Sequence, residues 1–250
     1  MNVKKNVIND LVGYDNLKIV QNNEYFNFSL ESILIPRFCI LKKEMKIIDF
    51  CTGNAPIPLI LSTLTDSEII GVEVQKEIYA LATESVKING LEERISILNE
   101  DVKKLPDLFE TDTFDLITCN PPYFKVNESS NLNDNYIKTV ARHEVMLTLN
   151  DIFAVSRKLL KNNGSVVMVH RTDRLSEILT LMTNNNLQPK RIRFIYPKEG
   201  KESNLVLIDA KKNGKIGVKV LPPLYCHNDD GSYTSEVLKM FERMWNYDST

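Results

Sequence analysis

KIIDFCTGNAPIPLILSTLTDSEIIGVEVQ, residues 46–75, is the stretch that decides the fold class. A short apolar run at 46–50 is followed by a turn of small residues, a second apolar stretch from residue 56, and another apolar run at 68–74. Short apolar runs bounded by turn residues are typical of buried strands. The stretch therefore predicts a strand–crossover–strand unit of a parallel sheet.

The same alternation continues along the chain. Apolar residues at helical spacing predict helices over 76–90 and 151–164, each ended by a glycine. Further strands are predicted from β-rich runs at 94–99, 114–120, 165–170, 191–196 and 204–212. The predicted fold is therefore α/β, with a mainly parallel sheet and helices on both of its faces.

Composition narrows the class of protein. The chain has 250 residues, 43% of them hydrophobic and 26% charged, with a formal net charge of −2. This balance excludes a disordered chain. No apolar run approaches the roughly 18–20 residues that span a bilayer, and the N-terminal sequence shows no signal-peptide pattern. We therefore expect a cytoplasmic protein without membrane contact, and we favour a monomer.

The chain divides into two unequal parts. Residues 1–45 precede the first predicted strand–helix unit, and we expect them to form a small cap. Residues 46–250 are expected to form a single compact domain. Within this domain, residues 124–140 are polar and rich in Asn and Ser, and we expect a mobile loop there.

Cysteine and histidine spacing argues against a metal site. The cysteines at 39, 51, 119 and 226 form no CxxC pair, and the histidines at 143, 170 and 227 form no HExxH motif. These spacings predict neither a disulfide framework nor a bound metal.

Polar residues follow four successive predicted strands. In open α/β sheets, ligands bind beyond the carboxyl ends of the strands. The residues at these ends are Asp49 with the turn at 51–55, Glu73, Asp101 with Glu100 beside it, and Asn120. The turn contains Gly53, which lets a ligand approach the backbone closely, but it is neither GxGxxG nor a P-loop. A carboxylate at position 73 suits two ribose hydroxyls.

The motif Asn120-Pro121-Pro122-Tyr123 is the most specific signal. Proline has no N–H to donate to a sheet, so the pair ends the strand, and Asn120 before it is held extended. The motif presents an amide oxygen, a free carbonyl and an aromatic ring together. This set suits a planar substrate with an NH2 group, which donates to Asn120 and to the Pro121 carbonyl while Tyr123 stacks on the ring.

These residues resemble a known family. The chain is similar to class I S-adenosylmethionine-dependent methyltransferases of the amino-methylating kind, which are marked by N-P-P-Y. More narrowly, it resembles the bacterial tRNA adenine-N6 methyltransferases that modify adenine 37 of a valine tRNA. The resemblance lies in QNNEYFNFSLESILI (21–35), DFCTGNAPIPLILS (49–62), GVEVQ (71–75), NPPYF (120–124), ARHE (141–144) and NDDGSYTSEV (228–237).

The resemblance implies a Rossmann-like fold with a seven-stranded sheet, to whose cofactor pocket the cap contributes. It implies S-adenosyl-L-methionine as cofactor and direct methyl transfer to the exocyclic amine of an adenine in tRNA. The implied catalytic residues are Asn120, Pro121, Pro122 and Tyr123. The expected cofactor-binding residues are Asp49, Cys51, Thr52, Gly53, Asn54, Glu73, Val74, Asp101, Val102 and Asn120.

One departure from the family concerns the first turn. Cys51 and Ala55 stand where the family typically has glycine. If either position needs a positive φ, the turn must shift and cofactor affinity suffers. We expect the departure to be tolerated, because Gly53 remains.

Basic residues suggest where RNA is bound. Residues 187–219 hold nine Lys or Arg against three acidic residues. Such a segment attracts phosphates, although ordinary solvated lysines account for it equally well. Arg142 and His143 are equally consistent with a phosphate contact, a local ion pair with Glu144 or a helix cap. The predicted RNA contacts are Arg142, His143, Lys190, Arg191, Arg193, Lys198 and Lys201.

Three other functions fit the motif. Glutamine methylation of a release factor also uses a planar NH2 group, although only 48 residues precede Asp49, where those enzymes have a longer helical domain. Guanine-N2 methylation of ribosomal RNA is a second alternative. A non-catalytic RNA-binding protein on a methyltransferase fold is the third, and measured cofactor binding separates it from the enzymes. A nicotinamide-dependent oxidoreductase is disfavoured because GxGxxG is absent.

Overall fold

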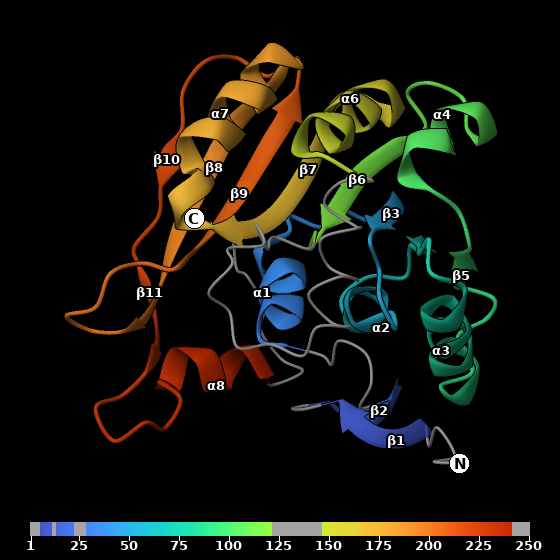
Figure 1. Cartoon of the computed structure of the whole chain (residues 1–250), viewed down its shortest axis with the longest axis horizontal. Coiled ribbons are helices and arrows are strands. Elements are labelled where there is room, and N and C mark those ends of the chain that lie inside the picture. The colour runs from blue at the N-terminus through green and yellow to red at the C-terminus, as the bar shows by residue number, and fades with distance from the viewer. Residues whose placement is uncertain (1–5, 12–13, 23–28, 122–146, 242–250) are drawn as a thin grey trace, which may run out of the picture.

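The computed structural model describes residues 6–11, 14–22, 29–121 and 147–241, and a single large sheet lies at its centre (Figure 1). Seven strands of this sheet match the predicted runs and confirm the α/β fold. They are β3 (Lys46–Phe50), β4 (Glu68–Val72), β5 (Ile95–Leu98), β6 (Phe114–Cys119), β7 (Leu160–Arg171), β8 (Leu187–Lys198) and β9 (Leu205–Lys212). Their order is β8-β9-β7-β6-β3-β4-β5, and only β9 runs antiparallel to its neighbours.

The sheet has nine strands in the described residues rather than the seven expected. Both β10 (Lys219–Val220) and β11 (Leu224–His227) pair in parallel with β8 and extend the sheet at that edge. The prolines at 222 and 223 separate the two strands and interrupt the ladder. Strands this short produce no periodic pattern in the sequence.

Helices cover both faces of the sheet, as predicted. One hydrophobic cluster is covered by α1 (Glu31–Phe38), α2 (Pro56–Ser62), α3 (Lys76–Ile88) and α8 (Ser235–Phe241). The other is covered by α4 (Leu105–Leu108), α6 (Leu149–Leu159) and α7 (Leu175–Asn184), with the short turns η1 (Val102–Lys104) and η2 (Thr172–Arg174) nearby. Among the described helices, none combines the length and apolar character needed to cross a membrane.

The helix expected over 151–164 is shorter than predicted and begins earlier. A capping box starts α6, in which the Asp151 N–H donates to the Thr148 hydroxyl (3.2 Å) and the Thr148 N–H donates to the Asp151 carboxylate (2.9 Å). The helix ends at Leu159 because Leu160 pairs with Phe114 and begins β7. A glycine that looks like a helix stop, Gly164, therefore lies inside the strand.

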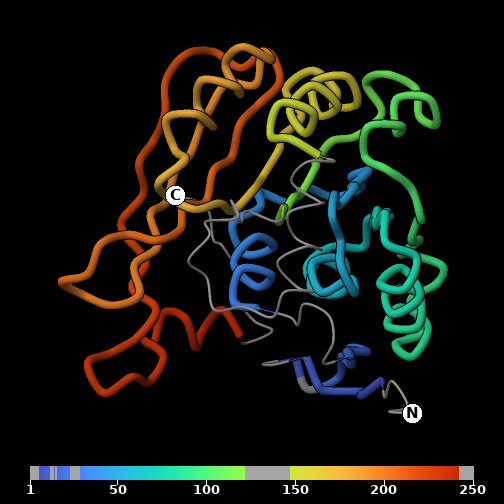
Figure 2. Tube along the Cα trace, in the orientation of Figure 1, coloured from blue at the N-terminus to red at the C-terminus, as the bar shows by residue number. Residues whose placement is uncertain are grey.

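The N-terminal segment consists of a β-hairpin and α1. The hairpin strands are β1 (Asn6–Leu11) and β2 (Tyr14–Asn22), which lie against α3 (Figure 2). The Val20 N–H donates to the Ser85 hydroxyl (2.9 Å), and Asn89 exchanges two hydrogen bonds with the Lys18 backbone (2.9 and 2.7 Å). The predicted loop at 124–140 lies outside the described residues.

The beginning of the described chain is tied to its end. The Met240 carbonyl in α8 accepts hydrogen bonds from the Arg37 Nε (3.0 Å) and from the Tyr14 hydroxyl (3.5 Å). The Arg37 guanidinium also lies over the Tyr14 ring, 5.6 Å from its centroid. Partners more than two hundred residues apart in sequence therefore meet beside α1.

Candidate functional site

The polar strand ends predicted from the sequence meet at one edge of the sheet. β3 lies between β4 and β6, and all three are parallel, with Phe50 opposite both Val72 and Cys119. The residues that directly follow these positions are Cys51, Glu73 and Asn120. β5 continues the row beside β4, so Asp101 follows at the same edge.

Asp49 lies beneath the turn that follows β3. Its side chain is fully buried, and its two oxygens accept hydrogen bonds from the hydroxyls of Thr52 (2.7 Å) and Thr118 (2.6 Å). Burial raises the pKa of Asp49 from 3.8 to about 7, and the two threonine hydroxyls oppose that rise. Asp49 therefore holds the turn against β6, and Thr118 is a positioning residue that the sequence analysis missed.

The turn at 51–55 adopts left-handed backbone angles at three positions. φ is +56° at Cys51, +58° at Gly53 and +70° at Ala55. Two non-glycine residues thus keep a conformation that costs about 1–2 kcal/mol each relative to glycine. Both Cys51 and Ala55 therefore have the positive φ that was expected to lower cofactor affinity. The turn nevertheless keeps two backbone hydrogen bonds, from the Thr52 N–H to the Val72 carbonyl (2.9 Å) and from the Ala55 N–H to the Thr52 carbonyl (3.0 Å).

Asn54 faces the N-terminal hairpin. Its amide nitrogen donates to the Val20 carbonyl (2.9 Å), and its side chain is buried. This contact joins the first turn of the central sheet to β2, which places the hairpin beside the candidate site.

Glu73 binds the same turn from the neighbouring strand. One carboxylate oxygen accepts from the Gly53 N–H (3.1 Å) and the other from the Gln75 N–H (2.9 Å). The side chain is only 6% exposed, and burial raises the pKa of Glu73. The next residue, Val74, is 39% exposed at the rim of the site.

Asp101 and Val102 lie at the end of β5. The Asp101 carboxylate caps η1 by accepting from the Lys103 N–H (2.9 Å), and Val102 is buried beneath it. Glu100 accepts from the Asp101 N–H (2.9 Å) and faces Lys104 at 3.5 Å. Of the two acidic neighbours, Asp101 therefore has the more buried side chain, at 21% exposed against 30% for Glu100.

Asn120 directly follows β6 and has a side-chain acceptor without a partner in the described residues. Its side-chain oxygen is buried and has no hydrogen-bond partner within the described ranges. A buried acceptor of this kind costs about 1–3 kcal/mol and marks a place that a donor fills. Pro121 beside it is buried. Pro122, Tyr123, Arg142 and His143 lie outside the described residues.

Two of the predicted RNA contacts have internal partners. Arg191 is paired with buried Asp209 (2.8 Å), and its guanidinium lies 4.4 Å from the Phe38 ring centroid. Arg193 is paired with Glu236 of α8 (2.5 Å) and is 11% exposed. Both arginines therefore fasten α1 and α8 to β8.

The predicted lysine contacts lie closer to solvent. The Lys190 ammonium donates to the carbonyls of Lys215 (2.9 Å) and Gly217 (2.8 Å), and Lys198 pairs with Asp229 at 3.4 Å. Lys201 is exposed in the turn after β8. These three stay predictions as RNA contacts.

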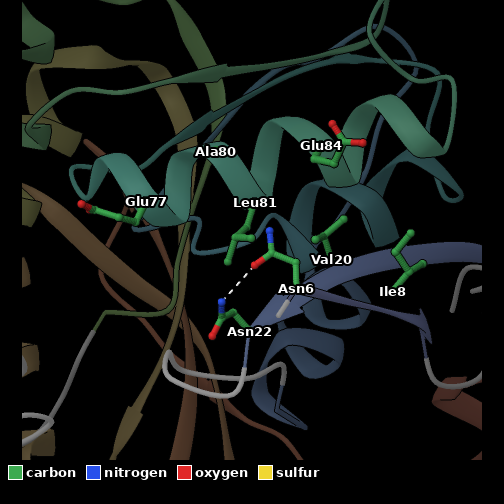
Figure 3. A pocket seen from close by; sticks show the side chains of 8 residues that line it. All are labelled: Asn6, Ile8, Val20, Asn22, Glu77, Ala80, Leu81 and Glu84. Carbon is green, nitrogen blue, oxygen red and sulfur yellow. Dashed lines mark hydrogen bonds between the residues drawn. The ribbon is translucent and has the colours of Figure 1, made fainter. Parts of the chain in front are cut away.

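A separate groove lies between the hairpin and α3 (Figure 3). Its volume is about 630 Å³, and it is lined by apolar Val20 and Leu81 and by the carboxylates of Glu77 and Glu84. The described residues that line the groove include none of the catalytic, cofactor-binding or RNA-binding residues predicted from the sequence. The groove is therefore distinct from the row of strand ends.

Gly71 leaves the room that Thr52 needs. A Cβ at this position would lie 2.9 Å from both the Thr52 hydroxyl and the Ile97 Cδ1. We expect Gly71→Ala to lower the free energy of unfolding by about 1–3 kcal/mol, because Thr52 must leave Asp49. Urea unfolding measures this loss. In the double variant with Thr52→Ala the cost should be smaller than the sum of the single costs, and additive costs would contradict the explanation.

The raised pKa of Asp49 predicts a stability that depends on pH. Its pKa is about 7 in the folded chain and 3.8 otherwise, so its contribution is complete below pH 3.8 and is lost as pH rises through 7. Between pH 5 and 7.5, the wild type should lose about 2 kcal/mol of unfolding free energy relative to Asp49→Asn. The difference between two urea titrations isolates Asp49, and parallel pH profiles would refute the assignment.

The residues at this edge fit S-adenosyl-L-methionine. Glu73 offers carboxylate oxygens to ribose hydroxyls, the space beside Gly53 is open, and exposed Val74 offers an apolar contact for an adenine ring. The described residues contain no cluster of three or more His, Cys, Asp or Glu side chains that could bind a metal ion. The expected absence of a metal stays a prediction.

Comparisons with known proteins identify the family of the chain. A family described as "Methyltransferase domain" matches residues 41–193. The tRNA1(Val) (adenine(37)-N6)-methyltransferase of Aeromonas hydrophila is 24% identical over 212 residues, which cover 84% of this chain and 86% of that protein.

Solved structures show the same fold. A predicted O-methyltransferase from Agrobacterium tumefaciens superposes with a TM-score of 0.69 at 16% identity, covering 85% of this chain and 97% of that one. Geranyl diphosphate C-methyltransferase from Streptomyces coelicolor, solved with S-adenosyl-L-homocysteine, gives 0.53 at 13% identity, covering 72% of this chain and 74% of that one.

The family match confirms the enzyme class and the cofactor predicted from the sequence: the protein is a methyltransferase that uses S-adenosyl-L-methionine. The matched residues, 41–193, span β3 to β8 and include every described strand end of the site. Because this match covers more than half of the sequence, the chain belongs to the methyltransferase-domain family.

Proposed function

We propose that the protein methylates the N6 amine of an adenine in tRNA, with position 37 of a valine tRNA as the favoured target. The observation that carries this proposal is the buried side-chain oxygen of Asn120, which has no partner within the described ranges. An exocyclic amine is the donor that such an oxygen accepts. The name of the Aeromonas hydrophila relative supports adenine in tRNA as the source of that amine.

Asn120 and Pro121 act by positioning the amine. The adenine N6 lone pair is delocalised into the ring, which makes the amine a poor nucleophile. Hydrogen bonds from the two N–H groups to the Asn120 oxygen and the Pro121 carbonyl favour a pyramidal nitrogen, and Tyr123 stacks on the base. Positioning and electrostatics then account for most of the rate, without a covalent enzyme intermediate.

The other strand ends bind the cofactor, which supplies an electrophilic methyl group when bound. Glu73 binds the ribose hydroxyls and also orients Gly53, while Val74 and Val102 pack on the adenine. Asp101 lies near the adenine amine. Asp49, Thr52 and Thr118 act beneath the turn and hold its shape. Residues 1–45 act as a cap, which the contact of Asn54 with Val20 supports, and residues 46–250 form the methyltransferase domain.

The test is methyl transfer from labelled S-adenosyl-L-methionine to unmodified tRNA, followed by nucleoside analysis. N6-methyladenosine in one tRNA species is the expected product. Transfer to a release factor or to ribosomal RNA instead of tRNA would replace the proposed substrate. Cofactor binding without transfer to any of the three would contradict the proposed reaction.

A further inference from the structure

Four aromatic side chains gather where β8 and β11 end, and we name them the aromatic cluster: Tyr196, Tyr225, His227 and Tyr233. Tyr196 and Tyr225 are register partners on the two strands, and their ring centroids are 5.4 Å apart. His227 and Tyr233 are stacked, with centroids 4.9 Å apart and planes inclined by 26°. The cluster therefore presents two adjoining ring pairs.

The cluster lies at the same edge of the sheet as Asn120. β7 is parallel to β6, and β9 is antiparallel to both β7 and β8, so β8 runs in the direction of β6. β11 is parallel to β8, so its last residues also lie at the carboxyl edge. Three strand spacings separate β6 from β8 and four separate β6 from β11, which is about 14 and 19 Å, or roughly four to six stacked nucleotides.

The rings are held in place by the segment that follows β11. The His227 ring bonds the Pro197 carbonyl (3.1 Å), and the Thr234 hydroxyl donates to the Tyr225 carbonyl (2.8 Å). Tyr233 also packs edge-on against Phe241, with centroids 5.4 Å apart. The contacts of His227 with Pro197 and of Tyr233 with Phe241 fix these two rings in advance, so a ligand that stacks on Tyr233 loses little free energy to ordering.

The two cluster residues on β11 face away from the core, while Tyr233 also contacts the core residue Phe241. Tyr225 and His227 alternate along β11 with buried Leu224 and Cys226, so they lie on the outer side of the strand. All members except Tyr233 are half-buried, and Tyr233 is 38% exposed. A large aromatic side chain left this open is available to a partner ring.

Charge at the cluster favours bases over phosphates. Lys198 is paired with Asp229, which is 97% exposed, and Asp230 lies beside it in the same turn. Because the carboxylates of Asp229 and Asp230 outnumber the one ammonium group, this surface attracts the backbone of duplex RNA weakly. Aromatic platforms bind unpaired bases by stacking, without needing excess positive charge at the ring.

We propose that the aromatic cluster is a substrate-recognition site that stacks an unpaired RNA base a few nucleotides from the methylated adenine. This inference rests on the proposed function, because it takes RNA as the substrate. Tyr233 is the ring that contacts the base, and His227 supports it from behind. Recognition of a loop by two separated bases then selects single-stranded RNA over a duplex.

The test compares Tyr233→Ala with wild type in two assays, methyl transfer to unmodified tRNA and direct binding of a fluorescent anticodon stem-loop. We expect KM and Kd for RNA to rise about tenfold while kcat and cofactor Kd stay near wild type. Tyr233→Phe keeps the ring and should restore affinity. Leu238→Ala, which removes an exposed apolar side chain from α8, serves as the matched control. If Tyr233→Ala does not fold, Tyr233→Leu replaces it.

The outcomes separate the inference from the proposed function. Methyl transfer to tRNA with equal RNA affinity in Tyr233→Ala and Leu238→Ala would overturn the aromatic site and leave the proposed function standing. RNA binding that depends on Tyr233, without methylation of tRNA, would support the site and overturn the proposed reaction. A protein substrate whose KM depends on Tyr233, with RNA binding unchanged, would overturn both.

Discussion

Replacing Asn120 with alanine is expected to lower kcat for methyl transfer by about 100- to 1,000-fold and to lower cofactor affinity far less. The reason is that the side-chain oxygen is buried without a partner in the described chain, so its function is fulfilled only when a substrate amine arrives. Single-turnover rates with saturating RNA, together with calorimetric binding of S-adenosyl-L-homocysteine, measure the two quantities separately.

The control for this experiment is Asn150→Ala, which removes an exposed asparagine from α6. It should keep full activity. Removing Asn120 also deletes an unsatisfied polar atom, so the variant should be no less stable than wild type. Near-normal turnover in Asn120→Ala would disprove the positioning role.

Glu73→Ala should weaken cofactor binding by at least about 100-fold, because two hydrogen bonds to a carboxylate contribute about 1.5–3 kcal/mol each. Part of the loss comes through Gly53 and Gln75, whose N–H groups lose their acceptor when the carboxylate is removed. Calorimetric titration with S-adenosyl-L-homocysteine measures the change. Glu77→Ala, an exposed carboxylate on α3, should bind like wild type.

A cofactor analogue separates the two roles of Glu73. A 2′,3′-dideoxy derivative of S-adenosyl-L-homocysteine lacks the ribose hydroxyls, so its affinity should fall much less in Glu73→Ala than the affinity of the parent compound. Equal losses for both compounds would mean that Glu73 acts only by holding the turn, and the ribose contact would be rejected.

The sheet was predictable because its central strands are buried on both faces. Runs such as 46–50 and 114–119 are mostly apolar, and small residues or prolines follow them. The sequence therefore predicts both the positions of these strands and the polar residues at their ends. Parallel strands then bring Asp49, Glu73 and Asn120 to one edge without further information.

Other features depend on contacts that no local pattern encodes. The early end of α6 follows from the pairing of Leu160 with Phe114, and the charge run at 187–219 gives no sign that Arg191 and Arg193 have internal partners. Thr118 was the one missed site residue with a visible signal, since it is a hydroxyl side chain in the otherwise apolar second half of β6.

The Met240 carbonyl that binds Arg37 and Tyr14 has a consequence for biosynthesis. During translation at about 5–20 residues per second, Arg37 is added 203 residues before Met240, so it cannot form this hydrogen bond until residue 240 has been made. The nascent enzyme therefore cannot close this contact on the ribosome until residue 240 leaves the exit tunnel. A chain whose synthesis stops before residue 240 lacks this carbonyl and therefore both hydrogen bonds that it accepts from Arg37 and Tyr14.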